Sequence, residues 1–294
     1  MRVAVFGAGG MLGRAILRHL RHKDGVRVFG YARTTGTARA PTAEPAAHAE
    51  MFALPSLTSV SALQEQLARS KPEAIINCIG RRGRPSTNDA VADMVLANSR
   101  WPHQIAALAA SVDARLIHFS TDGVFSGNKG GYQESDIPDA EDHYGRSKLL
   151  GEPEGKHCLT IRTSMIGHDH AESDQLVDWF LRQSGEIRGY ENVVFSGLTT
   201  VEIAKVLGDI LLPRSDMSGV WHLASHPISK YALLAQLAAQ YQAAVELKPW
   251  PAPVSNRSLD GSRFNAATGY TPPTWPNLIA ELWQSHQETQ GGKR

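Results

Sequence analysis

The sequence is poor in cysteine, in long apolar runs and in excess charge of either sign, and each shortage excludes a class of protein. The 294 residues include two cysteines, Cys78 and Cys158, too few for a disulfide framework and without the clustered spacing of a zinc site. No stretch approaches the roughly 20 apolar residues that span a bilayer. Thirty basic residues against 29 acidic ones give a net charge of +1, which argues against nucleic acid as the main partner.

The remaining composition is that of an ordinary globular protein, with 42% hydrophobic and 20% charged residues. The length allows roughly two domains at about 100–200 residues each. The first residues lack the longer apolar core and the cleavage site of a secretory signal. We therefore expect a soluble, cytoplasmic protein whose two cysteines are reduced and buried.

Short apolar runs alternate with helical patterns through the first two thirds of the chain. Strands are expected at residues 3–6, 26–31, 73–79, 115–120 and 158–165, and helices at 11–21, 59–70, 89–110 and 144–151. This alternation predicts an α/β fold in which helices cover both faces of a doubly wound parallel sheet. We expect residues 1–165 to form this nucleotide-binding domain, with a surface loop over residues 34–48.

Beyond residue 165 the pattern changes, and we expect a smaller C-terminal lobe over residues 166–294 that takes the substrate. Its expected elements are helices at 173–183, 200–212 and 229–242, an apolar run at 187–195 and a strand at 220–224. Thr199 or Thr200 is a suitable N-cap for the second helix, and the segment 199–212 is expected to return to the first domain. Six prolines between residues 249 and 276 predict that regular elements in the tail are short.

A glycine-rich turn, Gly7-Ala-Gly-Gly10-Met-Leu-Gly13, follows the first expected strand and opens the first expected helix. Glycines at these positions allow a tight turn, close approach of the backbone to a pyrophosphate and close packing of helix on strand. The second strand ends without the acidic residue that would hold a free ribose. Arg33 stands there instead and, together with Arg14, suits the extra phosphate of NADP. The sequence therefore favours NADPH, with NADH as the alternative cofactor.

Tyr144 and Lys148 are four residues apart and share one face of an expected helix. Reduction of a ketone requires a proton donor for its oxygen. The ordinary pKa of tyrosine is about 10, too high for efficient proton transfer at neutral pH. A neighbouring ammonium is expected to lower the pKa of Tyr144 towards neutrality. Ser120 and Thr121 close a strand upstream and offer hydroxyls to the carbonyl of the substrate.

These motifs together resemble the extended short-chain dehydrogenases/reductases and, within them, the dTDP-4-dehydrorhamnose reductase family. The matching segments are residues 7–13, Ser120-Thr-Asp-Gly-Val-Phe-Ser-Gly127, Tyr132-Gln-Glu134, Tyr144-Gly-Arg-Ser-Lys-Leu-Leu-Gly-Glu152, Ile161-Arg-Thr-Ser-Met-Ile-Gly167 and Phe195-Ser-Gly-Leu-Thr-Thr200. The resemblance implies that Tyr144 is the acid, that Lys148 tunes it and anchors the ribose, and that Thr121 donates to the carbonyl. It also implies that Asn98 lies near the active site and Ser164 beside the nicotinamide.

The motifs and the resemblance together define two sets of candidate residues. Cofactor binding is expected at Gly7, Gly10, Met11, Leu12, Gly13, Arg33, Cys78, Gly80, Asn98, Ser120, Tyr144, Lys148 and Ser164. Substrate binding is expected at Arg81, Thr121, Asp122, Val124, Tyr144, His168, Phe195 and Thr199. No metal site is expected, although His168-Asp169-His170 places two histidines two residues apart, and His168 is expected to line the substrate pocket.

Three features depart from the family's pattern. Residues 51–55 lack the aspartate that often holds the adenine, and Gly123 stands where better-known members place an aromatic residue. Arg81-Arg82-Gly83-Arg84 directly follows the expected strand at 73–79. Because ligands bind at the carboxyl ends of the strands in such sheets, these arginines are candidates for the diphosphate of a sugar nucleotide, with a solvated loop as the alternative.

The reaction implied is NADPH-dependent reduction of the C4 ketone of a nucleotide-linked 6-deoxy-4-hexulose, with dTDP-4-dehydro-L-rhamnose giving dTDP-L-rhamnose for surface polysaccharide or glycoside biosynthesis. Alternatives within the class are the dTDP-6-deoxy-L-talose epimer, a UDP-linked hexulose and 4-epimerisation. An alternative of another class is a non-catalytic regulatory subunit that binds NADP. The resemblance also implies a homodimer.

Overall fold

The computed structural model describes residues 1–33, 49–54, 57–169 and 174–291; the loop predicted at 34–48 lies outside the described residues. The chain divides into two compact units that each draw on separate stretches of sequence. Unit 1 consists of Met1–Val124, Ala140–Ile161 and Ala204–Val220, and unit 2 consists of Phe125–Asp139, Arg162–Ile203 and Trp221–Arg294.

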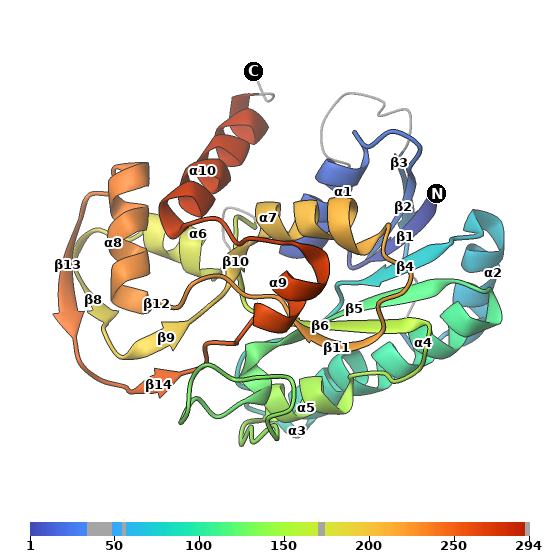
Figure 1. The fold of residues 1–294 in the computed structure, drawn as a ribbon, viewed down its shortest axis with the longest axis horizontal. Helices are drawn as coiled ribbons and strands as arrows, with labels where there is room; N and C mark the ends of the chain where they lie inside the picture. The colour runs from blue at the N-terminus through green and yellow to red at the C-terminus, as the bar shows by residue number, and fades with distance from the viewer. Residues whose placement is uncertain (34–48, 55–56, 170–173, 292–294) are drawn as a thin grey trace. The chain divides into compact units, whose positions relative to one another are not determined.

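A sheet of seven described strands has the order β11-β6-β5-β4-β1-β2-β3 (Figure 1). Its strands are β1 (Arg2–Phe6), β2 (Arg27–Ala32), β3 (Ala49–Ala53), β4 (Ala74–Asn77), β5 (Arg115–Thr121), β6 (Cys158–Thr163) and β11 (Gly219–His222). The neighbouring pairs from β5 to β3 are parallel. The strand order reverses between β1 and β4, which is where doubly wound sheets bind their ligands. The predicted α/β fold class is confirmed.

Helices cover both faces of this sheet within unit 1 (Figure 1). The helical segments of unit 1 are α1 (Met11–Leu20), α2 (Val60–Ser70), α3 (Asn88–Val95), η1 (Leu96–Arg100), α4 (Trp101–Ser111), η2 (Asp122–Val124), α5 (His143–Leu150) and η3 (Val206–Leu211), and α7 (Thr200–Lys205) begins in unit 2 and ends in unit 1. Helices α1 and η3 pack closely, since a Cβ on Gly208 would lie 2.7 Å from the His19 ring, and Lys23 pairs with Asp209 at 2.6 Å. The predicted helix 200–212 therefore supplies part of unit 1.

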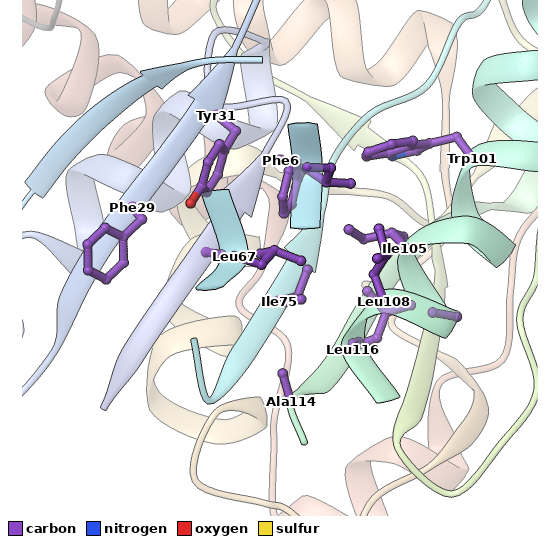
Figure 2. Packing of buried hydrophobic residues seen from close by; sticks show 14 of the residues in the cluster. Phe6, Phe29, Tyr31, Leu67, Ile75, Trp101, Ile105, Leu108, Ala114 and Leu116 are labelled. Atoms are coloured by element: carbon purple, nitrogen blue, oxygen red, sulfur yellow. The ribbon is translucent and has the colours of Figure 1, made fainter. Parts of the chain in front are cut away.

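Aromatic rings fill the core between the sheet and helices α2 and α4 (Figure 2). Phe6 stacks on Tyr31 with ring centroids 4.5 Å apart and meets Trp101 edge-on at 5.8 Å. Leu67 of α2 and Ile105 of α4 pack against the same cluster and are fully buried. This packing of large apolar side chains from strands and helices holds the strands in place. It thereby fixes the positions of the strand ends, which carry the polar residues described below.

Unit 2 is assembled from short strand pairs and helices. Its further elements are β7 (Met165–Ile166), α6 (Leu176–Leu181), β8 (Gly185–Tyr190), β9 (Val193–Phe195), β10 (Leu198–Thr199), β12 (Ile228–Ser229), α8 (Lys230–Tyr241), β13 (Val245–Trp250), β14 (Ser255–Asn256), α9 (Ser262–Thr268) and α10 (Trp275–Gly291). Strands β8 and β13 form a parallel pair against α8, and β9 lies between β12 and β14.

Two expectations about element lengths are wrong. The tail holds α10, a helix of 17 residues, although six prolines predicted short elements there. Pro276 lies in the first turn of α10, where its missing N–H costs no helical hydrogen bond. The strand expected at 158–165 ends at Thr163, and Met165–Ile166 pairs instead with Leu198–Thr199.

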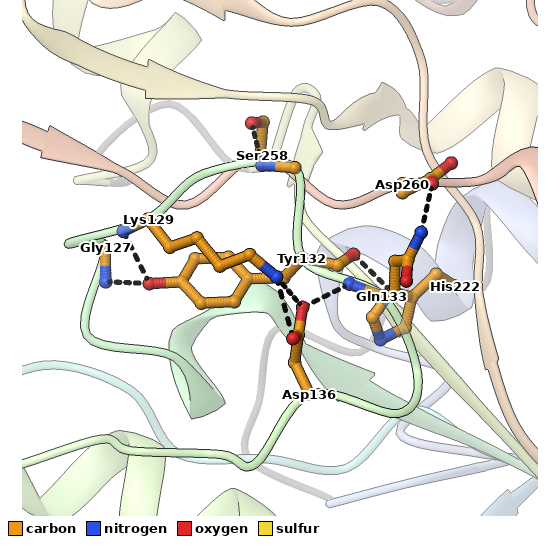
Figure 3. A network of polar contacts seen from close by, with 9 residues as sticks. Gly127, Lys129, Tyr132, Gln133, Asp136, His222, Ser258 and Asp260 are labelled. Carbon is orange, nitrogen blue, oxygen red and sulfur yellow. Dashed lines mark hydrogen bonds and ion pairs between the residues drawn. The ribbon is translucent and has the colours of Figure 1, made fainter.

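A network of hydrogen bonds holds segment 125–139 of unit 2 together (Figure 3). The Tyr132 hydroxyl accepts hydrogen bonds from the backbone N–H groups of Gly127 and Lys129, at 3.2 and 3.1 Å. The Lys129 ammonium pairs with Asp136 at 2.6 Å, and the Tyr132 carbonyl lies 3.0 Å from Nδ1 of His222. Tyr132 of the Tyr-Gln-Glu motif therefore organises a loop of unit 2.

Candidate active site

The glycine turn after β1 has the close packing that the sequence predicts. Gly7 has φ +83°, and the backbone N–H groups of Gly7 and Ala8 both donate to the Tyr31 carbonyl, at 3.0 and 3.1 Å. A Cβ on Gly13 would lie 2.2 Å from the Gly7 carbonyl oxygen, so only glycine allows α1 to approach β1 this closely. Gly7 also lies against the Cys78 backbone that follows β4, which places the turn where the strand order reverses.

The N-terminus of α1 suits a bound phosphate. Gly10 is its N-cap, no side chain caps the helix, and its first turn holds no acidic residue. Backbone N–H groups and the partial positive charge of the helix therefore point at the turn. Nη1 of Arg14 donates to the Gly9 carbonyl at 2.9 Å, and Arg33 follows β2 with an exposed side chain. These features fit a dinucleotide phosphate, and the NADP-specific role of Arg33 stays a prediction.

The structure brings Thr121 and Tyr144 together at the carboxyl end of β5. A Cβ on Gly123 would lie 3.3 Å from both Thr121 Oγ1 and a ring carbon of Tyr144, so the two side chains are close neighbours. Thr121 Oγ1 accepts from the Gly123 N–H at 3.0 Å and donates to Asp122 Oδ1 at 3.2 Å. Helix α5 is capped by Asp142, which accepts from the Gly145 N–H at 2.7 Å. A Cβ on Gly145 would lie 2.1 Å from the Gly123 carbonyl oxygen, so the start of α5 packs directly against the residues that follow β5.

The pKa of Tyr144 is raised above its ordinary value, chiefly because burial disfavours the phenolate. The nearby carboxylate of Asp122 raises it further, whereas the neighbouring Thr121 hydroxyl and the charge of Arg82 lower it. Lys148 is not among the groups that lower it. The expectation that the pKa of Tyr144 is drawn towards neutrality by Lys148 is therefore not met, and the hydroxyl keeps its proton at neutral pH.

Lys148 lies one helical turn from Tyr144 and is only 4% exposed. Its Nζ donates to the Phe119 carbonyl at 2.6 Å. Burial lowers the pKa of Lys148 from 10.5 to about 8, and the charge of Glu152 opposes this change. The amine thus carries its proton at neutral pH, close to the range in which it loses it.

Asn98 is fully buried in η1, a π-helical turn between α3 and α4. Its Oδ1 accepts from the Arg81 N–H, and its Nδ2 donates to the Arg81 carbonyl, both at 2.7 Å. Nδ2 also donates to Ser147 Oγ at 3.0 Å. The amide therefore ties the loop after β4 to α5, and such π-turns are frequent at functional sites. In the described structure Asn98 positions its neighbours, and its predicted contact with the cofactor stays untested.

The arginine loop after β4 lies beside these residues. A Cβ on Gly80 would be 3.9 Å from Nζ of Lys148. Cys78, two residues earlier in the chain, is half-buried. Arg81 forms an ion pair with Asp93. The guanidinium that the sequence assigned to substrate binding therefore already has a carboxylate partner. Arg82 is exposed and its charge acts on Tyr144. Arg82 is one of the arginines that the sequence offers for a diphosphate, and its electrostatic effect on Tyr144 is the part that the sequence did not predict.

Four predicted site residues belong to unit 2. Ser164 follows β6 and is half-buried, with its carbonyl accepting from the Leu198 N–H at 3.0 Å. Phe195 is 5% exposed and its ring centroid lies 5.6 Å from that of Trp275. Thr199 is fully buried and caps α7 by accepting from the Glu202 N–H at 3.2 Å. These residues pack within unit 2, and their binding roles stay predictions.

His168 is the fourth of these residues and joins three helices of unit 2. Its ring nitrogens lie 2.7 Å from Oδ1 of Asp178 and 2.8 Å from the Tyr241 hydroxyl. The ring also stacks on His286 with centroids 3.8 Å apart. The hydrogen bond from His168 and that from the Asp169 N–H lower the pKa of Asp178.

The other residues predicted to bind cofactor or substrate lie in unit 1. Leu12 and Val124 are buried, Met11 is half-buried, and Ser120 is 4% exposed with its hydroxyl on Glu152. Among the described residues no three His, Cys, Asp or Glu side chains are grouped as metal ligands would be. The helices described also include none with the length and apolarity that a bilayer crossing requires.

The strand order, the glycine turn and the Tyr–Lys pair define an extended short-chain dehydrogenase/reductase architecture. A family profile described as the RmlD substrate binding domain matches residues 1–288. The chain belongs to this family.

Three known proteins illustrate the similarity. Subunit beta of methionine adenosyltransferase 2 from Xenopus laevis is 32% identical over 153 residues, which are 51% of this chain and 41% of that protein. The probable low-salt glycan biosynthesis reductase Agl14 of Haloferax volcanii is 32% identical over 188 residues, which are 60% of this chain and 57% of that protein. The chain thus matches about half the length of these curated relatives.

A solved dTDP-4-dehydrorhamnose reductase from Bacillus anthracis, in complex with NADP, shares the fold with a TM-score of 0.76. It is 18% identical, and the match covers 97% of this chain and 99% of that one. This similarity supports the fold.

Proposed function

We propose that the protein is an NADPH-dependent reductase of the C4 ketone of a nucleotide-linked 6-deoxy-4-hexulose, with dTDP-4-dehydro-L-rhamnose as the preferred substrate. The observation that carries the proposal is the close approach of Tyr144 and Thr121 at the carboxyl end of β5, where a Cβ on Gly123 would lie 3.3 Å from an atom of each, with Lys148 buried one turn along α5. A nicotinamide cofactor supplies the hydride in this chemistry. The similarity to a glycan biosynthesis reductase and to a dTDP-4-dehydrorhamnose reductase supports the substrate class.

The residues of unit 1 fit such a cofactor. Gly13 has no side chain, so α1 can pack closely on the glycine turn. The first turn of α1 presents backbone N–H groups that can bind a phosphate, and it holds no acidic residue that would repel one. Arg33, exposed after β2, would hold the additional phosphate of NADPH. Lys148 would hold the nicotinamide ribose, because its Nζ lies beside Gly80 at the same edge of the sheet.

In this mechanism Tyr144 would donate its proton to the carbonyl oxygen at C4 of the substrate. Its raised pKa keeps this proton in place at neutral pH until the oxygen becomes basic. Thr121 orients the phenol and offers its hydroxyl to the same carbonyl oxygen. The positive charge of Arg82 would then stabilise the phenolate that remains, and Arg82 with Arg84 would receive the diphosphate of the substrate.

The test is NADPH consumption with a dTDP-4-keto sugar generated enzymatically in the same tube, with the product identified by NMR. We expect oxidation that yields dTDP-L-rhamnose and that is slowed by about 10²–10⁴-fold in Tyr144→Phe. The talose epimer or turnover of a UDP-linked hexulose would change the substrate and keep the mechanism. Tight NADPH binding with no turnover of any keto sugar, identical in Tyr144→Phe, would replace the reductase by a regulatory subunit.

A further inference from the structure

Lys148 carries a positive charge inside the protein, and few groups face it. The titratable groups that interact electrostatically with it are Cys78 after β4, His118 on β5 and Glu152 beyond the end of α5. Burial raises the pKa of Cys78 and holds the pKa of His118 well below its ordinary value, so both are uncharged at neutral pH. Glu152 is therefore the anion among the described groups that act on this ammonium.

Glu152 and Lys148 are both bound by the end of β5. Its Oε1 accepts a hydrogen bond from Ser120 Oγ at 2.6 Å. The Phe119 carbonyl, one residue earlier, accepts from Nζ of Lys148 at the same distance of 2.6 Å. Two consecutive strand residues thus anchor the carboxylate and the ammonium, and Ser120 and Lys148 are both only 4% exposed.

Burying an ammonium without a nearby negative charge costs free energy, and such an amine ordinarily loses its proton instead. The Phe119 carbonyl contributes one dipole, which satisfies one of three donors. A carboxylate fixed on the neighbouring strand residue is the group that can balance the charge itself.

We infer that Glu152 is a positioning residue that, held by Ser120, serves as the counter-charge that keeps Lys148 protonated beside Tyr144. The consequence for catalysis rests on the proposed reductase function, whereas the charge pairing does not. Burial lowers the pKa of Lys148 and Glu152 raises it, in agreement with this assignment.

The sign of the pH dependence follows from the lowered pKa. The folded protein gives up the Lys148 proton above about pH 8, whereas the unfolded chain keeps it up to the ordinary value of 10.5. The cost of the buried charge is therefore present below that range and is relieved as the pH rises through it. Glu152 offsets this cost only while Lys148 is charged, so its contribution to stability must shrink with rising pH.

The first experiment measures thermal unfolding of the full chain and needs no substrate. Glu152→Gln is expected to lower Tm near pH 7, and the difference from the unmodified protein is expected to shrink as the pH rises beyond about 9. In a Lys148→Met background the same change should cost less than half as much. Glu154→Gln removes an exposed carboxylate two residues further on and should change neither Tm nor activity.

Equal losses of Tm in both backgrounds, independent of pH, would overturn the assignment and leave Glu152 as a hydrogen-bond partner of Ser120 alone. If Glu152→Gln does not fold, the double variant decides: folding restored by Lys148→Met supports the pairing, and no restoration contradicts it.

The second experiment follows the reductase reaction against pH once turnover is found. Glu152→Gln is expected to move the alkaline limb of kcat to lower pH, because the charge of Glu152 raises the pKa of Lys148 and the variant removes that charge. Ser120→Ala loosens the carboxylate but keeps its charge, so it should lower kcat with a smaller shift of the limb. An alkaline limb that stays in place in Glu152→Gln would contradict the inference, while absence of turnover in the unmodified protein would contradict only the proposed function.

Discussion

Gly151, which ends α5, allows one of the closest backbone approaches in unit 1. It has φ −96° and ψ 10°, a conformation that alanine adopts without strain. A Cβ at this position would nevertheless lie 1.7 Å from the Asn98 carbonyl oxygen and 2.8 Å from its carbonyl carbon. Because real Cβ contacts are essentially never under 3.0 Å, Gly151→Ala must separate α5 from η1 by at least 3.0 − 1.7 = 1.3 Å.

The separation affects both stability and geometry. Overpacking of this kind costs typically about 1–3 kcal/mol, and each kcal/mol corresponds to about 2–4 °C of Tm in a chain of this size, so we expect a loss of roughly 2–12 °C. The same shift loosens the 3.0 Å hydrogen bond from Asn98 to Ser147 and moves the neighbouring Lys148. A misplacement of about 1 Å at a catalytic group can cost about 10²-fold in rate.

The assay is thermal unfolding together with the rate of NADPH-dependent reduction. Gly261→Ala is the matched control, because Gly261 has nearly the same backbone conformation, φ −93° and ψ 5°, and its Cβ would meet Ala224 at an ordinary 3.4 Å. Gly151→Ala as stable and as active as Gly261→Ala would refute the steric argument.

Further predictions concern the cofactor, the proton donor and pH. Arg33→Ala is expected to weaken binding of NADPH by about 10–100-fold and leave binding of NADH unchanged, since a hydrogen bond to a charged group contributes about 1.5–3 kcal/mol; equal losses for both cofactors by calorimetry would contradict this role. Tyr144→Phe should lower kcat by about 10²–10⁴-fold with the Kd for NADPH unchanged, and a smaller loss would remove Tyr144 as the acid. The rate of reduction should fall as the pH rises through about 8, where Lys148 loses its proton, and a flat profile to pH 10 would contradict that dependence.

The sequence predicted the parts of the site that depend on local pattern. The glycine turn needs glycine at fixed offsets between β1 and α1, and Tyr144 and Lys148 share a helix face by periodicity alone. The pKa of Tyr144 was predicted in the wrong direction, because burial and the nearby carboxylate of Asp122 depend on tertiary packing. The long helix α10 was missed because Pro276 at a helix start resembles a helix breaker in sequence.

Other features have no local signal. Nothing around Asn98 in the sequence indicates a π-turn, since the turn arises where the loop after β4 and helix α5 both hydrogen-bond to one amide. The assignment of Phe125–Asp139 to unit 2 likewise depends on contacts with residues more than 100 positions later, such as the Tyr132 N–H donating to the Ser258 carbonyl at 2.9 Å.

The interleaving of the two units separates the order of synthesis from the order of folding. Unit 1 lacks its last segment until Val220 has left the ribosome, although most of its sheet is complete by Val124. The intervening 220 − 124 = 96 residues take roughly 5–20 s to synthesise at about 5–20 residues per second. During that time the Arg115 side chain lacks the Leu211 and Met217 carbonyls that accept its hydrogen bonds at 2.6 and 2.8 Å. The nascent sheet therefore keeps an unpaired edge until β6 and then β11 have been synthesised.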